Sequence, residues 1–191
     1  MSGRAAVFLD RDGTLIEESG YINRIDALRL FPWSLEAVRL LNRGGFCVIV
    51  VTNQAGVARG YFDEAFVRRA HEHLASAIRA AGGEVDGFYH CPHHPDAVVA
   101  EYRKRCDCRK PAPGMFLDAA RTHGLDLAAS YSIGDRWHDV QAAQRAGATA
   151  VMVRTGYGST ELERPRAGVT PAHVADTLID ATTWILRQRA S

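Results

Sequence analysis

Short apolar runs alternate along the chain with longer stretches in which apolar residues recur every three or four positions. The short runs predict strands, and the longer stretches predict amphipathic helices. This alternation is typical of an α/β protein with a doubly wound, Rossmann-like parallel sheet. The predicted strands are 5–10, 46–53, 85–90, 130–135 and 149–156, and the predicted helices are 34–43, 63–81, 114–123, 137–146 and 175–189.

Glycines follow four of the predicted helices, at 44–45, 82–83, 124 and 147. Glycine is the common residue just past a helix end, so these positions support the predicted boundaries. The segment 157–172 is rich in glycine, proline and mixed charge, and we expect it to be a mobile connection.

Composition excludes several classes of protein. The 191 residues are 47% hydrophobic and 24% charged with a net charge of +1, so no nucleic-acid or anionic-membrane partner is expected. No apolar run approaches the roughly 20 residues that span a bilayer, and the first residues do not read as a signal peptide. We expect a cytoplasmic monomer, whose four cysteines are reduced thiols or metal ligands.

Polar residues end three of the predicted strands. Asp10 and Asp12 end the first, Thr52 ends the second and Asp135 ends the fourth. Ligands of open α/β sheets bind at the carboxyl ends of the strands. Each residue taken alone also suits a helix cap, but the set favours a shared site.

The chemistry of this set suits phosphoryl transfer. Asp10 and Asp135 are the kind of carboxylate that binds Mg²⁺ beside a substrate phosphate. Asp10 is also able to attack phosphorus and carry the group as an aspartyl-phosphate, with Asp12 moving the proton. Thr52 and Lys110 are the expected donors to charge that develops on the transferred group.

The stretches "DRDGTL", "VVTNQ", "RKPAPGMF" and "IGDRWHD" resemble, in order, the four motifs of the haloacid dehalogenase superfamily of phosphatases. The resemblance implies that Asp10 is the nucleophile and Asp12 the acid/base, with Thr52 and Lys110 stabilising the phosphoryl group. It also implies Mg²⁺ on Asp10, on the backbone carbonyl of Asp12 and on Asp135. Asp139 is expected to orient its neighbours, and the first strand to lie between the second and the fourth.

The segment 91–113 has three cysteines, two histidines and four prolines, and it shows no core-building periodicity. Three thiolates and an imidazole are an ordinary structural zinc set, and unrelated free thiols are the alternative. The nitrogen ligand is either His93 or one of His90 and His94, whereas Cys47 reads as a small buried residue. The predicted Zn²⁺ ligands are Cys91, His93, Cys106 and Cys108.

Within the superfamily, "CPHHP…CDCRKP" resembles the group that hydrolyses histidinol phosphate and heptose 1,7-bisphosphate. That group carries a zinc loop in place of a large cap domain, which implies one domain over 1–191 with a zinc loop at about 91–110. Arg59 and Arg109 are cations for a second phosphate, unless they are ordinary surface arginines. The expected substrate contacts are Glu18, Ser19, Gly20, Tyr21, Asn53, Gln54, Ala55, Arg59 and Arg109.

The resemblance implies a Mg²⁺-dependent phosphatase that removes the C7 phosphate of heptose 1,7-bisphosphate, in the supply of lipopolysaccharide precursors. Histidinol-phosphate hydrolysis is the alternative within the group. A non-catalytic receiver domain is an alternative from another class, but both aspartates here follow the first strand. Beside the last motif, His138 could support the catalytic acids, but we expect it to be an exposed helix residue.

Overall fold

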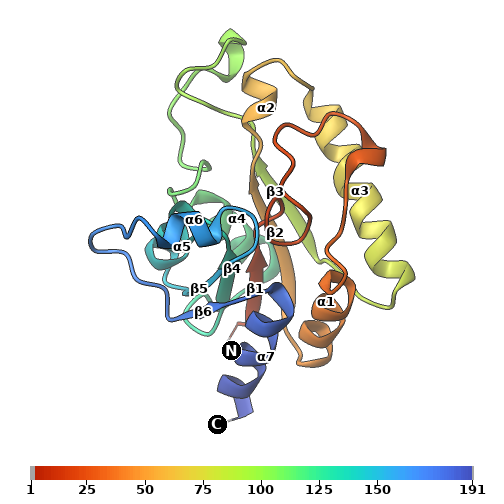
Figure 1. Ribbon diagram of the computed structural model, residues 1–191, viewed down its shortest axis with the longest axis vertical. Coiled ribbons are helices and arrows are strands. Elements are labelled where there is room, and N and C mark those ends of the chain that lie inside the picture. The colour runs from red at the N-terminus through yellow and green to blue at the C-terminus, as the bar shows by residue number, and fades with distance from the viewer. Residues whose placement is uncertain (1–2, 191) are drawn as a thin grey trace.

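A six-stranded parallel sheet forms the centre of the computed structural model, which describes residues 3–190 (Figure 1). The strands lie in the order β3-β2-β1-β4-β5-β6, so β1 is between β2 and β4 as predicted. From β1 the chain adds β2 and β3 on one side, and it then crosses back to add β4, β5 and β6 on the other side of β1. The loops after β1 and β4 meet at this reversal of strand order, where ligands of such sheets bind. The strands are β1 (Ala6–Leu9), β2 (Cys47–Asn53), β3 (Gly87–Cys91), β4 (Tyr131–Gly134), β5 (Thr149–Val153) and β6 (His173–Ala175).

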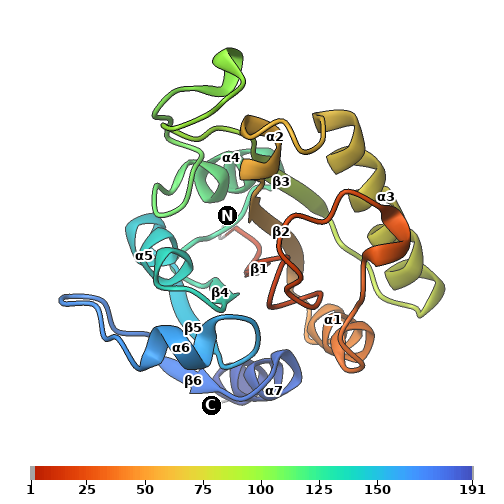
Figure 2. The same cartoon turned by 45° about the horizontal axis from the view of Figure 1, so that its top comes forward.

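Helices cover both faces of the sheet, which confirms the doubly wound arrangement (Figure 2). One face carries α1 (Ser34–Arg43), α3 (Glu64–Ala80) and α7 (Leu178–Ala190), and the other carries α4 (Gly114–His123) and α5 (Trp137–Ala146). The short helices are α2 (Ala55–Ala58) and α6 (Gly158–Leu162), with 3₁₀ turns η1 (Ile25–Ala27) and η2 (Ala100–Tyr102). Among residues 3–190, no helix is both long and apolar enough to span a bilayer.

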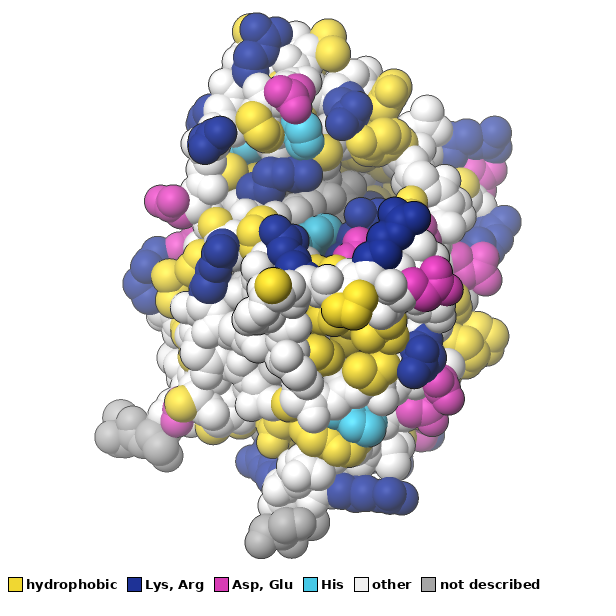
Figure 3. Space-filling view, turned by 60° about the vertical axis from the view of Figure 1, so that its left-hand side comes forward, with side chains coloured by type: hydrophobic (Ala, Val, Ile, Leu, Met, Phe, Trp, Pro, Cys, Tyr) yellow, Lys and Arg dark blue, Asp and Glu magenta, His cyan; other side chains and the backbone are white. Residues whose placement is uncertain are grey.

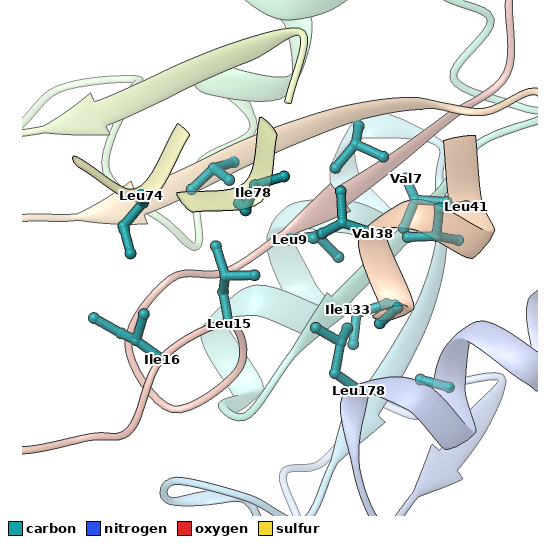
Figure 4. Close-up of a cluster of buried hydrophobic side chains, with 14 of the residues drawn as sticks. Val7, Leu9, Leu15, Ile16, Val38, Leu41, Leu74, Ile78, Ile133 and Leu178 are labelled. Carbon is teal, nitrogen blue, oxygen red and sulfur yellow. The ribbon is translucent and has the colours of Figure 1, made fainter. Parts of the chain in front are cut away.

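The alternation of side chains along β1 divides the core into two layers. Val7 and Leu9 pack with α1, α3 and α7 (Figure 4), whereas Ala6 and Phe8 pack with α4 and α5. All four side chains are fully buried. A strand covered on both faces has no polar side, which explains why the sequence shows an unbroken apolar run there.

The C-terminal region differs from the prediction. The last helix begins at Leu178 rather than 175, because the Thr177 hydroxyl caps it by accepting from the Asp180 backbone N–H at 3.5 Å. The same hydroxyl donates to the Asp180 carboxylate at 2.6 Å. Residues before it form the edge strand β6, which at three residues is too short to show alternation. The predicted connection 157–172 contains the helix α6.

Candidate active site

A buried lysine forms ion pairs beneath a pocket at the carboxyl edge of the sheet, and one of its partners, Asp10, lines that pocket. The Lys110 ammonium is 2.6 Å from Asp10 Oδ1 and 2.7 Å from Asp139 Oδ1, and it donates to the Val51 carbonyl at 2.8 Å. Asp10, Asp135 and Asp139 each bring one carboxylate oxygen to a common point, all within 4.8 Å of one another. The structure therefore brings together the ends of β1 and β4 and the segment before α4, as the sequence predicted.

Burial controls the protonation of these groups. It raises the pKa of Asp10 to about 7, with the charges of Asp139 and Asp12 acting in the same direction against Lys110. It raises the pKa of Asp135 to about 9, helped by the charges of Asp10 and Asp139. For Lys110, burial alone would lower the pKa, but the two carboxylates beside it outweigh that effect and raise it. When ionised, the carboxylates of Asp10, Asp135 and Asp139 carry more negative charge than the Lys110 ammonium neutralises. The cluster therefore favours the binding of a further cation.

The environment of Asp135 fits Mg²⁺. One carboxylate oxygen, Oδ2, accepts from the Tyr157 backbone N–H at 2.7 Å. The other, Oδ1, is buried with no hydrogen-bond partner among the described residues. Gly13 and Gly156 contact this carboxylate so closely that a side chain at either position would collide with it. An unpartnered carboxylate oxygen close to that of Asp10 belongs to the hard oxygen donor set that Mg²⁺ requires.

The Asp12 carboxylate is held away from Lys110 by other partners. The Arg11 guanidinium donates to both of its oxygens, at 3.0 Å each, and Arg11 is only 3% exposed. Gln54 Nε2 donates to Asp12 at 2.9 Å and to the Thr52 hydroxyl at 2.8 Å. The sequence predicted Gln54 as a substrate contact and did not predict a role for Arg11.

Asn53 was also predicted as a substrate contact, and it borders the pocket. Its side-chain amide donates to the Lys110 carbonyl at 3.1 Å, and its Oδ1 accepts from the Lys110 N–H at 3.0 Å. Both polar atoms of the Asn53 side chain are therefore hydrogen-bonded to the backbone of Lys110.

The pocket has a volume of about 260 Å³ and is open to solvent. Figure 3 shows a hollow with Lys and Arg side chains around its rim and acidic side chains within it. Of the predicted substrate contacts, Ser19 and Arg59 are exposed and lie outside the lining. The lining includes the predicted contacts Glu18, Gly20, Tyr21, Asn53, Gln54, Ala55 and Arg109. Beyond that set of contacts it includes Arg11, Ile22, Gly56, Phe62, Arg136, His138 and Tyr157.

His138 corrects an expectation. Its side chain is 28% exposed rather than open to solvent, because it packs beside Asp139, with Nε2 3.4 Å from Oδ1. Burial lowers its pKa to about 4, so the ring is neutral near pH 7. It therefore offers a neutral polar group to the pocket wall.

The cysteine cluster forms beside this pocket. Ligand atoms of Cys91, His93, Cys106 and Cys108 all lie within 4.8 Å of one another. The three sulfurs are 3.1 to 3.5 Å apart, and His93 Nδ1 is 3.4 Å from Cys108 Sγ. Hydrogen bonds from Cys91 and then Cys106 lower the pKa of Cys108 to about 5, so that it is a thiolate. This donor set fits tetrahedral zinc.

The other candidate ligands are engaged elsewhere. His90 is paired with Glu64 at 2.9 Å, and His94 Nδ1 accepts from the Asp96 N–H at 3.1 Å. Cys47 is fully buried within the sheet, as predicted. Of the three histidines that the sequence left open, His93 is therefore the one that lies with the thiols.

Comparisons with known proteins agree with this geometry. Residues 107–181 match a family described as HAD-hydrolase-like. The D-glycero-beta-D-manno-heptose-1,7-bisphosphate 7-phosphatase of Escherichia coli O6:H1 is 43% identical over 185 residues, which are 96% of this chain and 95% of that protein. The enzyme of the same name from Photorhabdus laumondii is 47% identical over 155 residues, covering 81% of this chain and 82% of that protein.

Among solved structures, a D,D-heptose 1,7-bisphosphate phosphatase from B. bronchiseptica, complexed with magnesium and phosphate, superposes with a TM-score of 0.86. It is 35% identical, and the match covers 96% of this chain and 99% of that one. The chain belongs to the family of D-glycero-beta-D-manno-heptose-1,7-bisphosphate 7-phosphatases, within the HAD-like hydrolases.

Proposed function

We propose that this protein is a Mg²⁺-dependent phosphatase that removes the C7 phosphate of D-glycero-β-D-manno-heptose 1,7-bisphosphate. The observation that carries the proposal is the buried Asp10 carboxylate, which lines an open pocket and lies 2.6 Å from the Lys110 ammonium. The substrate follows from the relatives, which are heptose 1,7-bisphosphate 7-phosphatases.

In the first half of the reaction, the unprotonated Asp10 oxygen attacks phosphorus and the bond from phosphorus to the C7 oxygen breaks. Asp12 gives its proton to that oxygen, which leaves as the sugar hydroxyl. Lys110 and the Thr52 hydroxyl stabilise the charge on the transferred group, in a site where burial strengthens each interaction. Asp10 and Asp135 would hold Mg²⁺, which would supply positive charge beside the phosphoryl oxygens.

In the second half, the ionised Asp12 takes a proton from water as the water oxygen attacks phosphorus. The bond from phosphorus to Asp10 breaks, which releases phosphate and restores both carboxyl groups. Arg11 and Gln54 hold Asp12 through hydrogen bonds to its carboxylate oxygens, so they fix the orientation of the group that moves the proton.

The substrate is a small molecule because the pocket of about 260 Å³ suits a sugar phosphate and is bordered by loops. Arg109, which follows the cysteine cluster, places a guanidinium in its wall. A phosphate that is not transferred is the natural partner of such a group.

The test compares kcat/KM for heptose 1,7-bisphosphate and for histidinol phosphate, in wild type and in Asp10→Asn. We expect the wild type to prefer the bisphosphate and the variant to be inactive while it stays folded, because Asn is isosteric with Asp. A preference for histidinol phosphate would overturn the substrate. Activity that survives Asp10→Asn would remove Asp10 from the role of nucleophile.

A further inference from the structure

The Glu64 carboxylate joins helix α3 to two separate parts of the segment that carries the cysteine cluster. Its Oε2 accepts from His90 Nε2 at 2.9 Å, and its Oε1 accepts from the Tyr102 hydroxyl at 2.9 Å. The side chains of Glu64 and His90 are 34% and 18% exposed, so the contact between them is partly shielded from water. Both oxygens of one carboxylate are therefore engaged with the same segment.

The two donors to Glu64 stand at different points of the chain relative to the cluster. His90 directly precedes the ligand Cys91 in β3. Tyr102 ends η2, between the second and the third of the four clustered ligands. Glu64 lies in the first turn of α3, a helix of 17 residues that packs on the sheet. One rigid helix thus holds both the start and the middle of the segment.

Tyr102 is coupled to the clustered imidazole through the backbone. Its carbonyl accepts from the His94 N–H at 3.1 Å, and its ring centre lies 6.1 Å from that of His93. The His93 carbonyl accepts in turn from the Arg109 guanidinium at 3.1 Å. A series of contacts therefore runs from Glu64 through Tyr102 to a zinc ligand, and from that ligand to an arginine of the pocket wall.

The middle of the segment has weak support of other kinds. In Figure 1 it extends beyond the sheet, beside α2. There the backbone N–H groups of Val98 and Val99 both donate to the Ala58 carbonyl, at 3.0 Å each. Val98 is 74% exposed, so this part of the chain buries little of that side chain. A segment without extensive apolar packing opens easily, which gives a polar contact such as that of Tyr102 with Glu64 a large share in its order.

The protonation of these groups favours a persistent contact. Burial acts to raise the pKa of Glu64, but the hydrogen bonds from His90 and Tyr102 outweigh it and lower that pKa. Burial, followed by the hydrogen bond to Glu64, raises the pKa of Tyr102 to about 12. Near pH 7 an ionised acceptor therefore faces a protonated hydroxyl, and hydrogen bonds to charged groups are stronger than those between neutral groups.

We propose that Glu64 is a positioning residue that preorganises the cysteine cluster for zinc, acting through His90 and Tyr102. The two contacts hold Cys91 and His93 in place in the folded chain before the metal binds, so less conformational freedom is lost on binding. The effect on zinc requires no substrate. The effect on catalysis, through the arginine that follows the cluster, rests on the proposed function.

The experiment measures zinc affinity by competition with a chromophoric chelator, and the rate at which the zinc-loaded enzyme loses its metal to excess chelator. Glu64→Ala removes both contacts and should lower the affinity about 10- to 100-fold, the range for partners of metal ligands, with faster metal loss. Tyr102→Phe removes one hydroxyl and should show part of this effect. Glu64→Gln keeps the size of the side chain and one acceptor oxygen, and it should recover part of the affinity.

Glu72→Ala is the matched control, because it removes an exposed carboxylate from the same helix. It should bind zinc as the wild type does. The Tm of each zinc-loaded variant is recorded, since a purely structural role for Glu64 would lower Tm without changing zinc affinity. In zinc-loaded Glu64→Ala, KM for heptose 1,7-bisphosphate should rise more than kcat falls, because Arg109 in the pocket wall loses its fixed position.

The outcomes separate this proposal from the proposed function. Zinc affinity and metal loss that are unchanged in both Glu64→Ala and Tyr102→Phe would overturn the role of Glu64. An equal loss of affinity in Glu72→Ala would overturn it as well, because the effect would then belong to the helix. If the wild type does not hydrolyse the bisphosphate but Glu64→Ala still weakens zinc binding, the proposed function fails and the role of Glu64 stands.

Discussion

The Asn53 side chain holds the main chain of Lys110 from both sides. Its amide donates to the Lys110 carbonyl, and its Oδ1 accepts from the Lys110 N–H, at 3.1 and 3.0 Å. The last residue of β2 therefore fixes the backbone position of Lys110. This relationship joins the second motif to the third, and we propose that Asn53 positions the lysine rather than contacting the substrate.

Asn53→Ala should lower kcat more than it changes KM. Two neutral hydrogen bonds of about 0.5–1.5 kcal/mol each are lost, and a Lys110 ammonium that moves off Asp10 stabilises the transition state less. We expect a decrease in kcat of about 5- to 100-fold, measured under saturating substrate.

Asn53→Asp is the companion variant. It keeps the acceptor for the Lys110 N–H, but it replaces the amide donor that faces the Lys110 carbonyl with a second acceptor oxygen. It should therefore not restore activity. If Asn53→Ala instead raised KM at constant kcat, the residue would be a substrate contact, as the sequence predicted.

Gln54 should matter through Asp12. Its Nε2 donates to the Asp12 carboxylate at 2.9 Å. Gln54→Glu keeps the size of the side chain but replaces this donor with an acceptor, and two carboxylates at hydrogen-bond distance repel each other. We expect a decrease in kcat of about tenfold or more, from a lost hydrogen bond to a charged group.

The measurement is a pH–rate profile of wild type and Gln54→Glu. Because the substitution disturbs the residue that moves the proton, the pH dependence of kcat should differ between the variant and the wild type. An unchanged profile with unchanged kcat would show that Gln54 does not act on Asp12.

Magnesium should stabilise the protein more strongly as pH rises. In the metal-free protein the pKa of Asp10 is about 7 and that of Asp135 about 9, both raised from 3.8. At a pH between 3.8 and these raised pKa values, the folded chain holds protons that the unfolded chain has released. The stability of the metal-free protein therefore falls as pH rises through this window. Mg²⁺ replaces those protons, and its apparent affinity should rise by up to about tenfold per pH unit for each proton displaced.

The measurement is the shift of Tm on adding Mg²⁺, at about pH 6 and about pH 8, where the larger shift is expected at the higher pH. Asp135→Asn is the control: its Mg²⁺ shift should vanish, and the metal-free Tm should depend less on pH. A shift of equal size at both values would contradict the linkage.

Loss of zinc should reduce both stability and activity. Cys106→Ser removes one of four clustered ligands, and Cys108 is followed directly by Arg109 and Lys110. We expect less than one zinc per chain and a Tm lower by at least about 5 °C, since each kcal/mol lost shifts Tm by about 2–4 °C at this size. Zinc content, Tm and kcat are measured on the same samples.

Cys47→Ala is the matched cysteine control, because Cys47 is buried in the sheet and away from the cluster. It should keep its zinc and its kcat, whatever its effect on Tm. Undiminished zinc and stability in Cys106→Ser would count against a structural metal site.

Three of the site residues that the sequence identified, Asp10, Thr52 and Asp135, stand at the ends of buried strands. Asp10 and Asp135 directly follow β1 and β4, and the carboxyl ends of neighbouring parallel strands meet at the same edge of the sheet. Their convergence was therefore predictable. The cysteine cluster was predictable for a different reason. Its segment shows no core-building periodicity, so a bound metal was the expected source of its order.

The residues that were missed depend on a partner that only the folded chain supplies. Arg11 reads as an ordinary charge in an acidic turn until its guanidinium is seen on Asp12. Tyr157 lies in a segment without periodicity, and its importance comes from Arg136 above it and Asp135 beside it. The edge strand β6 depends on its pairing with β5 rather than on a pattern of its own.

The two glycines that enclose Asp135 limit how the enzyme can be redesigned. Gly13 and Gly156 come from loops far apart in the chain, and a methyl group at either would occupy the place of the carboxylate. Both also have positive φ, of 89° and 56°, which side chains tolerate poorly. Variant libraries that aim to change substrate preference should keep these two positions as glycine and diversify the walls around Glu18, Arg109 and Arg136 instead.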